Sequence, residues 1–262
     1  MKKVFFKITG VNLLLCFLSF QTQAQDKSQI RFSISPILYD NLTLSHEGEK
    51  LLNASKTLNG LGLISYYQPL GNEYGINAGL GLRLTSYNIN YDIEIPENSV
   101  FDNGIRTGNL EINHNAYSNA LYMVPVSFQK TFKSKSSMRY SIELGVTANF
   151  VSQKELLETM SVWCENVEDG SDQLFGMTLD NLPETTKMLS YFIKVGLIKG
   201  NKIGDSFHVN LVANYSPKLI ASGSYEFFNL GYESAGNIEQ NINYIGIEFS
   251  YGLSLNNKKH SK

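Results

Sequence analysis

The sequence predicts an all-β protein: one eight-stranded antiparallel up-and-down β-barrel that crosses a membrane. Three observations lead to this fold class. The chain opens with a basic and then apolar segment, polar and apolar residues alternate in many short stretches, and short connections alternate with long ones. The 15 Tyr and 15 Phe residues occur beside a slightly polar mean hydropathy of −0.16. A membrane barrel has this composition because only every second residue of each strand is apolar.

The N-terminal segment has the pattern of a secretory signal peptide. Three lysines lie within the first seven residues, and an apolar stretch of about ten residues follows at 11–20. That stretch is too short to cross a bilayer as a helix. The motif Thr22-Gln23-Ala24 offers small residues to a signal peptidase. We therefore expect a signal peptide over 1–24 and a single barrel domain over 25–262.

A lipoprotein anchored through Cys16 is the alternative for this segment. It is disfavoured because Leu15 and Phe17 stand where small residues are expected, and because the apolar run continues beyond the cysteine. Removal of the signal leaves 19 basic and 24 acidic residues, a net charge of −5, which gives no basic patch for nucleic acid. Cys164 is then the remaining cysteine, so no internal disulfide is possible.

Alternation with a period of two identifies the strands. In seven segments apolar residues occupy every second position. An eighth segment, 57–68, also has strand composition, but its apolar face is ambiguous. The seven segments are 30–35, 76–85, 122–132, 139–150, 191–197, 207–215 and 245–253.

The lengths of the connections between strands indicate that the barrel lies in a membrane. Short turns on one side and long loops on the other are typical of a bacterial outer-membrane barrel, with both termini in the periplasm. A soluble sandwich or lipocalin-type barrel is the alternative, but its loop lengths need not sort by side. The short connections are 69–74, 133–137 and 200–206, and the long ones are 41–56, 93–115, 152–187 and 220–239.

The residues between the apolar positions include charged ones. A charged side chain that faced lipid near the midplane would cost roughly 2–4 kcal/mol, so we expect these to face the barrel interior and form a charge network. The small residues among them suit an interior that side chains fill. We therefore predict a plugged lumen closed to ions. The charged members of this set are Arg31, Arg83, Glu143, Lys194, His208 and Glu248.

One strand pair carries a resemblance to a known family. The segment 122–130 reads YMVPVSFQK, and 140–146 reads YSIELGV. A strand with an internal proline that ends in a basic residue, followed by a strand with glycine, resembles the PorT-like outer-membrane β-barrel family. The resemblance extends loosely over the mature chain and implies an outer-membrane barrel that, for some members, takes part in protein secretion. Two features depart from the pattern of this family. The final strand is followed by the tail 256–262 instead of ending on an aromatic residue, and the third long loop is longer than a minimal member needs.

No residue set predicts catalysis or a cofactor. Outer-membrane lipid hydrolases use Ser and His with a carboxylate or amide, and Ser45, His46 and Glu47 are the local group of these types. Neighbours along one segment do not converge on a point. His46 and His114 are therefore expected to be solvated loop residues, and His260 lies in the polar tail.

The third long loop predicts a short helix and a partner-binding surface. Its apolar residues have the spacing of an amphipathic helix, which could cover the barrel mouth, bind a partner or lie on the membrane. An acidic run follows at 165–172, without the spacing of an EF-hand, and we expect no metal there. The predicted helix residues are Leu156, Leu157, Met160 and Trp163, the last being the sole tryptophan.

Three functions remain open at this point. The leading hypothesis is a non-enzymatic barrel that acts as a scaffold or accessory subunit of an outer-membrane complex or that stabilises the envelope, and the resemblance suggests protein secretion as the context. Its expected partners are outer-membrane lipids and proteins of such a complex. The alternatives are a lipid A or phospholipid hydrolase and a small porin, and the charged lumen argues against the porin.

Overall fold

The computed structural model describes residues 27–39, 42–95, 99–100, 108–132, 138–151, 157–166, 170–182, 187–200, 205–230 and 233–255. The predicted signal peptide, Leu156 and His260 lie outside these ranges. No helix of the described chain is long and apolar enough to span a membrane. The strands are β1 (Gln29–Tyr39), β2 (Leu42–Leu44), β3 (Glu47–Gly48), β4 (Asn53–Ser55), β5 (Thr57–Pro69), β6 (Tyr74–Ile95), β7 (Ser99–Val100), β8 (Gly108–Phe132), β9 (Met138–Val151), β10 (Leu157–Asn166), β11 (Gly170–Asn181), β12 (Lys187–Gly200), β13 (Ser206–Tyr215), β14 (Ala221–Phe227), β15 (Ser234–Gln240) and β16 (Tyr244–Ser254).

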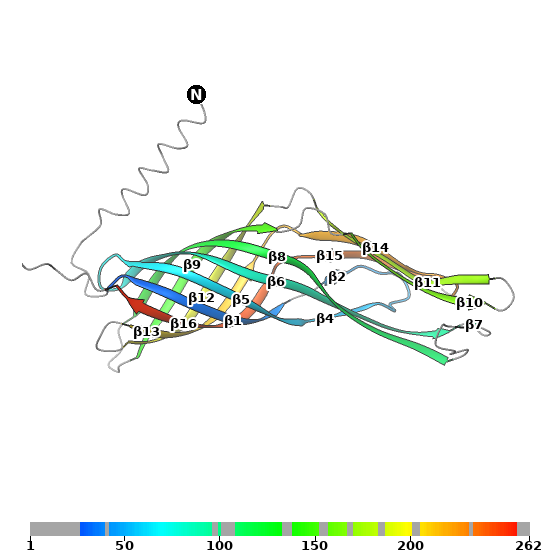
Figure 1. Cartoon of the computed structure of the whole chain (residues 1–262), viewed down its shortest axis with the longest axis horizontal. Coiled ribbons are helices and arrows are strands. Elements are labelled where there is room, and N and C mark those ends of the chain that lie inside the picture. Colours follow the sequence, from blue (N-terminus) through cyan, green and yellow to red (C-terminus); the bar gives the residue numbers. More distant parts are fainter. Residues whose placement is uncertain are drawn as a thin grey trace, which may run out of the picture.

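Eight of these strands close into a barrel. They are hydrogen-bonded in the order β6-β5-β1-β16-β13-β12-β9-β8, and β8 pairs back to β6. Every neighbouring pair is antiparallel. The first strand lies beside the last, from Gln29 opposite Ser254 to Tyr39 opposite Tyr244. The predicted eight-stranded antiparallel barrel is confirmed, and Figure 1 shows it as the left half of the molecule.

The alternation of side chains decides what the barrel wall presents to each side. On β13, Leu211 faces outward and is 59% exposed, whereas His208 faces inward and is 2% exposed. The face of β5, ambiguous in the sequence, is set by its pairing with β1 and β6. Leu61 and Leu63 point inward, and Gly62 between them faces outward. The interior therefore holds a small apolar cluster among its polar residues.

Two strands continue far beyond the barrel rim. β6 has 22 residues and β8 has 25, whereas a membrane-spanning strand needs about 9–11. Ser86 pairs with Tyr117 while Thr85 pairs with Asn119, so Ser118 is the extra residue of a β-bulge. Because of this bulge, odd-numbered residues of β8 face inward in the barrel and even-numbered ones do so in the extension.

Segments of all four long loops form a second sheet. Its strands lie in the order β2-β15-β14-β11-β10-β7, and β3 also pairs with β15. This sheet and the extension of β6 and β8 lie on opposite sides of the right half of the molecule in Figure 1. Buried apolar residues from β6, β11, β14 and β15 form one cluster between them. We call this part, composed of the second sheet and residues 86–120, the extracellular sandwich.

The helix predicted in the third loop is wrong. Residues 157–166 form strand β10, which pairs with β11 along its whole length. Met160 is half-buried on the core side of the strand, whereas Trp163 lies on the other side and is 53% exposed. The helical spacing was therefore coincidental. The period-two series of Met160, Val162 and Cys164, which faces the sandwich core, describes the segment instead.

Candidate functional site

The centre of the barrel interior is a buried ion cluster. Lys194 on β12 lies between Glu143 on β9 and Glu248 on β16. Its Nζ atom is 3.6 Å from Oε1 of Glu143 and 2.8 Å from Oε2 of Glu248. Lys194 and Glu143 are directly opposite in the β9–β12 ladder, so the pairing register brings them together. All three side chains are almost completely buried.

Neutral side chains add hydrogen bonds to both carboxylates of this cluster. Ser127 Oγ donates to Oε1 of Glu143 at 2.5 Å, and Asn77 Nδ2 donates to the same atom at 3.4 Å. Asn210 Nδ2 donates to Oε1 of Glu248 at 2.9 Å. These contacts come from β6, β8, β9, β13 and β16, so the network crosses the barrel interior. A buried charge cluster is tolerated when its members are hydrogen-bonded in this way.

A second network lies toward the short turns. Ser206 Oγ donates to Oε1 of Gln29 at 3.1 Å and is 2.7 Å from Nε2 of His208. Arg31 Nε donates to the same oxygen of Gln29 at 3.2 Å, and its Nη1 donates to Gln129 at 2.7 Å. The guanidinium also lies 3.8 Å from the ring centre of Tyr67. Arg31 therefore links β1 to β8 across the lumen.

Arg83 closes the interior toward the long loops. Its Nη1 donates to the carbonyl oxygen of Ile242 at 2.9 Å, and its guanidinium lies 4.6 Å from the ring centre of Tyr244. Asn214 Nδ2 donates to the same carbonyl at 3.1 Å. The structure thus places all six predicted lumen residues inside the barrel, each 6% exposed or less. It brings Lys194 together with the two glutamates, while Arg83 and His208 take other partners.

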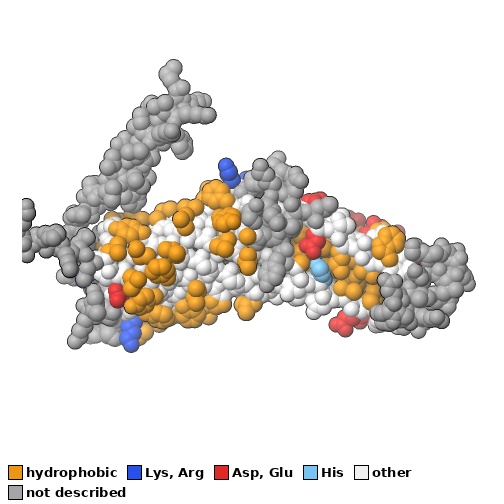
Figure 2. Space-filling view, viewed as in Figure 1, with side chains coloured by type: hydrophobic (Ala, Val, Ile, Leu, Met, Phe, Trp, Pro, Cys, Tyr) orange, Lys and Arg blue, Asp and Glu red, His pale blue; other side chains and the backbone are white. Residues whose placement is uncertain are grey.

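The outer wall of the barrel is apolar over its full circumference. Figure 2 shows hydrophobic side chains gathered over the barrel and acidic ones over the extension. A barrel with an apolar belt outside and ion pairs inside suits a bilayer and not water. The protein is an integral barrel of the bacterial outer membrane. The belt includes Phe32, Ile34, Leu80, Leu82, Leu84, Val124, Val126, Ile142, Leu144, Ile193, Val195, Leu211, Ile247 and Phe249.

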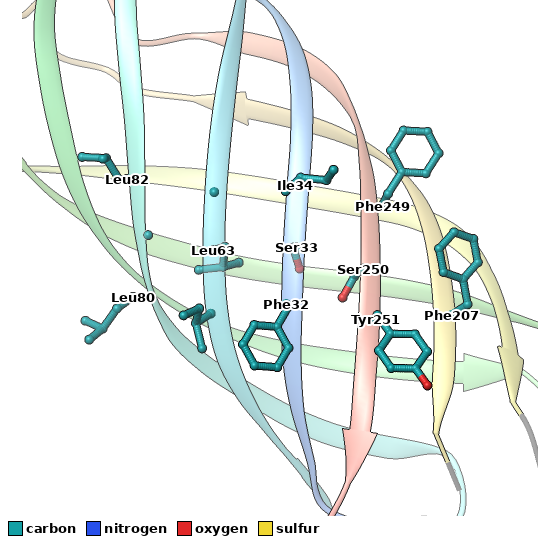
Figure 3. A pocket seen from close by; sticks show the side chains of 13 residues that line it. Phe32, Ser33, Ile34, Leu63, Leu80, Leu82, Phe207, Phe249, Ser250 and Tyr251 are labelled. Atoms are coloured by element: carbon teal, nitrogen blue, oxygen red, sulfur yellow. The ribbon is translucent and has the colours of Figure 1, made fainter. Parts of the chain in front are cut away.

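A hollow of about 690 Å³ lies in the belt and is shown in Figure 3. It extends over β5, β1 and β16, and Phe32, Phe249 and Tyr251 lie along it. Gly62 faces outward there, and a side chain added to it would meet no atom within 4 Å. The hollow exists because Gly62 has no side chain to fill it. Since the hollow lies in the apolar belt, it faces lipid chains.

Aromatic residues hold the extracellular sandwich together. The ring of Tyr91 on β6 is centred 4.7 Å from that of Phe175 on β11 and 5.2 Å from that of Phe227 on β14. The rings of Phe175 and Phe227 are 4.8 Å apart. Burial raises the pKa of the Tyr91 phenol, as expected for a group removed from water. This core was not predicted from the sequence, although the alternating pattern of 87–95 indicates a strand with one apolar face.

His46 and His114 are both partly buried and each contacts another side chain, so neither is the solvated loop residue expected from the sequence. Nδ1 of His46 is 2.5 Å from the hydroxyl of Tyr225, and partial burial together with Lys50 lowers the pKa of His46. Ser45 Oγ accepts a hydrogen bond from the backbone of Asn237 at 3.0 Å. His114 Nε2 lies 3.1 Å from Oε1 of Glu158. Within the described residues no group of three or more His, Cys, Asp or Glu side chains could hold a metal ion.

Charge is distributed unequally between the two ends of the barrel. The segments 40–56, 86–120, 152–187 and 216–243, which form the loop end, contain 19 of the 24 acidic residues and six basic ones. This end therefore has a formal net charge of −13. Long loops of outer-membrane barrels face the exterior of the cell, so the acidic surface belongs to the extracellular sandwich.

The sequence matches no protein-family model and no curated protein. Two solved structures with a similar fold are bacterial outer-membrane proteins. One is the outer-membrane protein OprG from Pseudomonas aeruginosa, with a TM-score of 0.39 and 10% identity over 89% of this chain and 100% of that chain. The other is a major outer-membrane protein from Thermus thermophilus, with a TM-score of 0.37 and 11% identity over 86% of this chain and 99% of that chain. Similarity at this level gives no information on function.

Proposed function

We propose that the protein is a non-enzymatic outer-membrane barrel that acts as a scaffold or accessory subunit of an outer-membrane protein complex. In this role the barrel anchors the extracellular sandwich, and the sandwich contacts the partners. The resemblance of 122–130 and 140–146 to PorT-like barrels favours a secretion complex as the setting. Stabilisation of the envelope through such contacts belongs to the same proposal.

The observation that carries this proposal is the folded state of the loop end. Tyr91, Phe175 and Phe227 pack at the centre of a 19-residue apolar core. Loops that served only to close the barrel would need neither this length nor a core. Binding residues concentrate on loops that a rigid scaffold positions, and here the loops are themselves a scaffold.

The barrel interior supports this proposal over a porin. A water-filled pore requires lining side chains that contact water, whereas Lys194, Glu143 and Glu248 are buried against one another. The Ser206–His208 pair similarly disfavours a hydrolase. Both residues are 2% exposed, which denies access to a lipid, and the Ser206 hydroxyl also contacts the buried amide of Gln29.

Affinity purification from gently solubilised outer membranes tests the proposal. The wild-type protein should retain its partners, and a variant in which a short Gly/Ser turn replaces 153–186 should lose them, because β10 and β11 are then missing from the sandwich. A variant with a Gly/Ser segment in place of 133–137 is the matched control, since the ends that it joins, Phe132 of β8 and Met138 of β9, lie at the opposite end of the barrel. Equal recovery of partners with all three proteins would contradict the proposal, as would a steady nanosiemens conductance in planar bilayers.

A further inference from the structure

Two strand edges of the extracellular sandwich lack a pairing partner among the described residues. The ladder between β8 and β9 ends where Leu121 pairs with Val151, so residues 108–120 of β8 pair with β6 alone. Residues 157–164 of β10 pair with β11 alone, and β7 joins β10 only at 165–166. We call these two edges together the β8–β10 opening. His114 of β8 and Glu158 of β10 contact each other across it.

We propose that the β8–β10 opening binds an extended, basic segment of a partner polypeptide as an added β-strand. An exposed sheet edge offers backbone N–H and C=O groups at the spacing of a strand, and this is a recurring mode of peptide recognition. The inference rests on the proposed partner-binding function and specifies the chemistry of the partner.

Both edges lack lysine and proline, two of the features by which proteins prevent strand addition. Exposed edges usually carry lysine or proline, which block pairing with another chain. The edge of β8 reads GNLEINHNAYSNA, and that of β10 reads LETMSVWC. Neither contains lysine, arginine or proline. An edge that remains this accessible is suited to pairing.

Apolar side chains next to the opening offer contacts to the added strand. Ile112 on β8 and Met160 and Val162 on β10 pack against the sandwich core but remain partly exposed. Alternate side chains of an inserted strand would cover them, because successive residues of a strand point to opposite faces. On the outer face of β10, Trp163 is 53% exposed and stands beside the edge.

Charge determines which polypeptide fits. Glu111 of β8 is exposed, Glu158 of β10 is partly exposed, and the four segments of the loop end together have a formal net charge of −13. A strand with lysine or arginine at alternate positions is attracted to this surface. A second copy of the chain would present the same acidic edge and be repelled, so the occupant is a basic segment of another polypeptide.

The mature barrel in detergent micelles can be titrated with a ten-residue peptide of alternating valine and lysine. Because Trp163 is the sole tryptophan, a change in its fluorescence reports binding directly. We expect saturable binding that weakens several-fold between low and high salt, and no binding of the valine–glutamate peptide. Peptides N-methylated on one alternating set of amides should lose about tenfold in affinity, because those amides can no longer donate to the strand edge.

Variants of the protein separate edge binding from general attraction. The double variant E111Q/E158Q should bind the lysine peptide about threefold to tenfold more weakly. E226Q on β14, outside the opening, is the matched control and should bind like wild type. Equal loss in E226Q, or full binding of all N-methylated peptides, would show charge attraction without strand addition and overturn the inference. Edge-dependent dimers in sedimentation, or no peptide binding while partners still co-purify, would also overturn it and leave the proposed function intact.

Discussion

Replacement of Lys194 with methionine should strongly destabilise the barrel. The methionine side chain has a similar length but no charge, so Glu143 and Glu248 would remain buried without their cation. Both carboxylates lie within 4 Å of Nζ in the wild-type protein, at 3.6 and 2.8 Å. No described side chain other than Lys194 forms a salt bridge with either glutamate.

The size of the effect follows from the burial of the cluster. Removal of one partner from a buried ion pair costs about 3–5 kcal/mol, because the remaining charge is left uncompensated. With a urea dependence of roughly 2–3 kcal/mol per M, the unfolding midpoint should fall by about 1–2.5 M. Unfolding of the barrel in lipid vesicles can be followed by the gel mobility of unboiled samples and by far-ultraviolet circular dichroism.

Two further variants determine whether charge is the cause. The triple variant K194M/E143Q/E248Q has no uncompensated charge, and its amides can still accept from Ser127 and Asn210, so it should recover most of the lost stability. K199M, on the same strand but exposed, should change stability by less than about 0.5 kcal/mol. A loss in K194M no greater than in K199M would refute the reasoning, and a triple variant less stable than K194M would show that packing matters more than charge.

Three further predictions concern the sandwich and the wall. Phe175→Ala should destabilise the sandwich by about 3–5 kcal/mol and make its loops protease-sensitive, while the barrel keeps its gel mobility. Trp163→Ala, at an exposed site, should leave the protease resistance and the gel mobility unchanged. Equal protease resistance of the two variants would count against an aromatic core. The buried thiol of Cys164 should react with maleimide only after denaturation, so rapid labelling of the folded protein would contradict the structure. Gly223→Ala should disrupt the pairing of β11 and β14, because the Cβ of the new alanine would lie 1.8 Å from a backbone oxygen. Gly62→Ala should leave stability unchanged, because nothing lies within 4 Å of the added Cβ. Equal midpoints of urea unfolding for the two variants would disprove this prediction.

The barrel and its lumen residues could be predicted from the sequence because both depend on a local pattern. A strand places successive side chains on opposite faces, so alternation alone assigned Arg31, Glu143 and Lys194 to one face. The cost of a charge in lipid then decided that this face is the interior. The inward face of the strand 57–69 could not be assigned from the sequence, because Leu61 and Leu63 are apolar residues that point into an otherwise polar lumen.

The structure of the loop end was decided only by tertiary contacts. The spacing of Met160 and Trp163 fits a helix, and pairing with β11 makes the segment a strand instead, because the ladder hydrogen bonds to that partner replace those of a helix. The bulge at Ser118 and the closure of the sandwich around Tyr91 likewise join segments that lie far apart in the chain. Local sequence records which residues alternate, but only the folded chain determines which edges meet and which, like those of the β8–β10 opening, are left exposed.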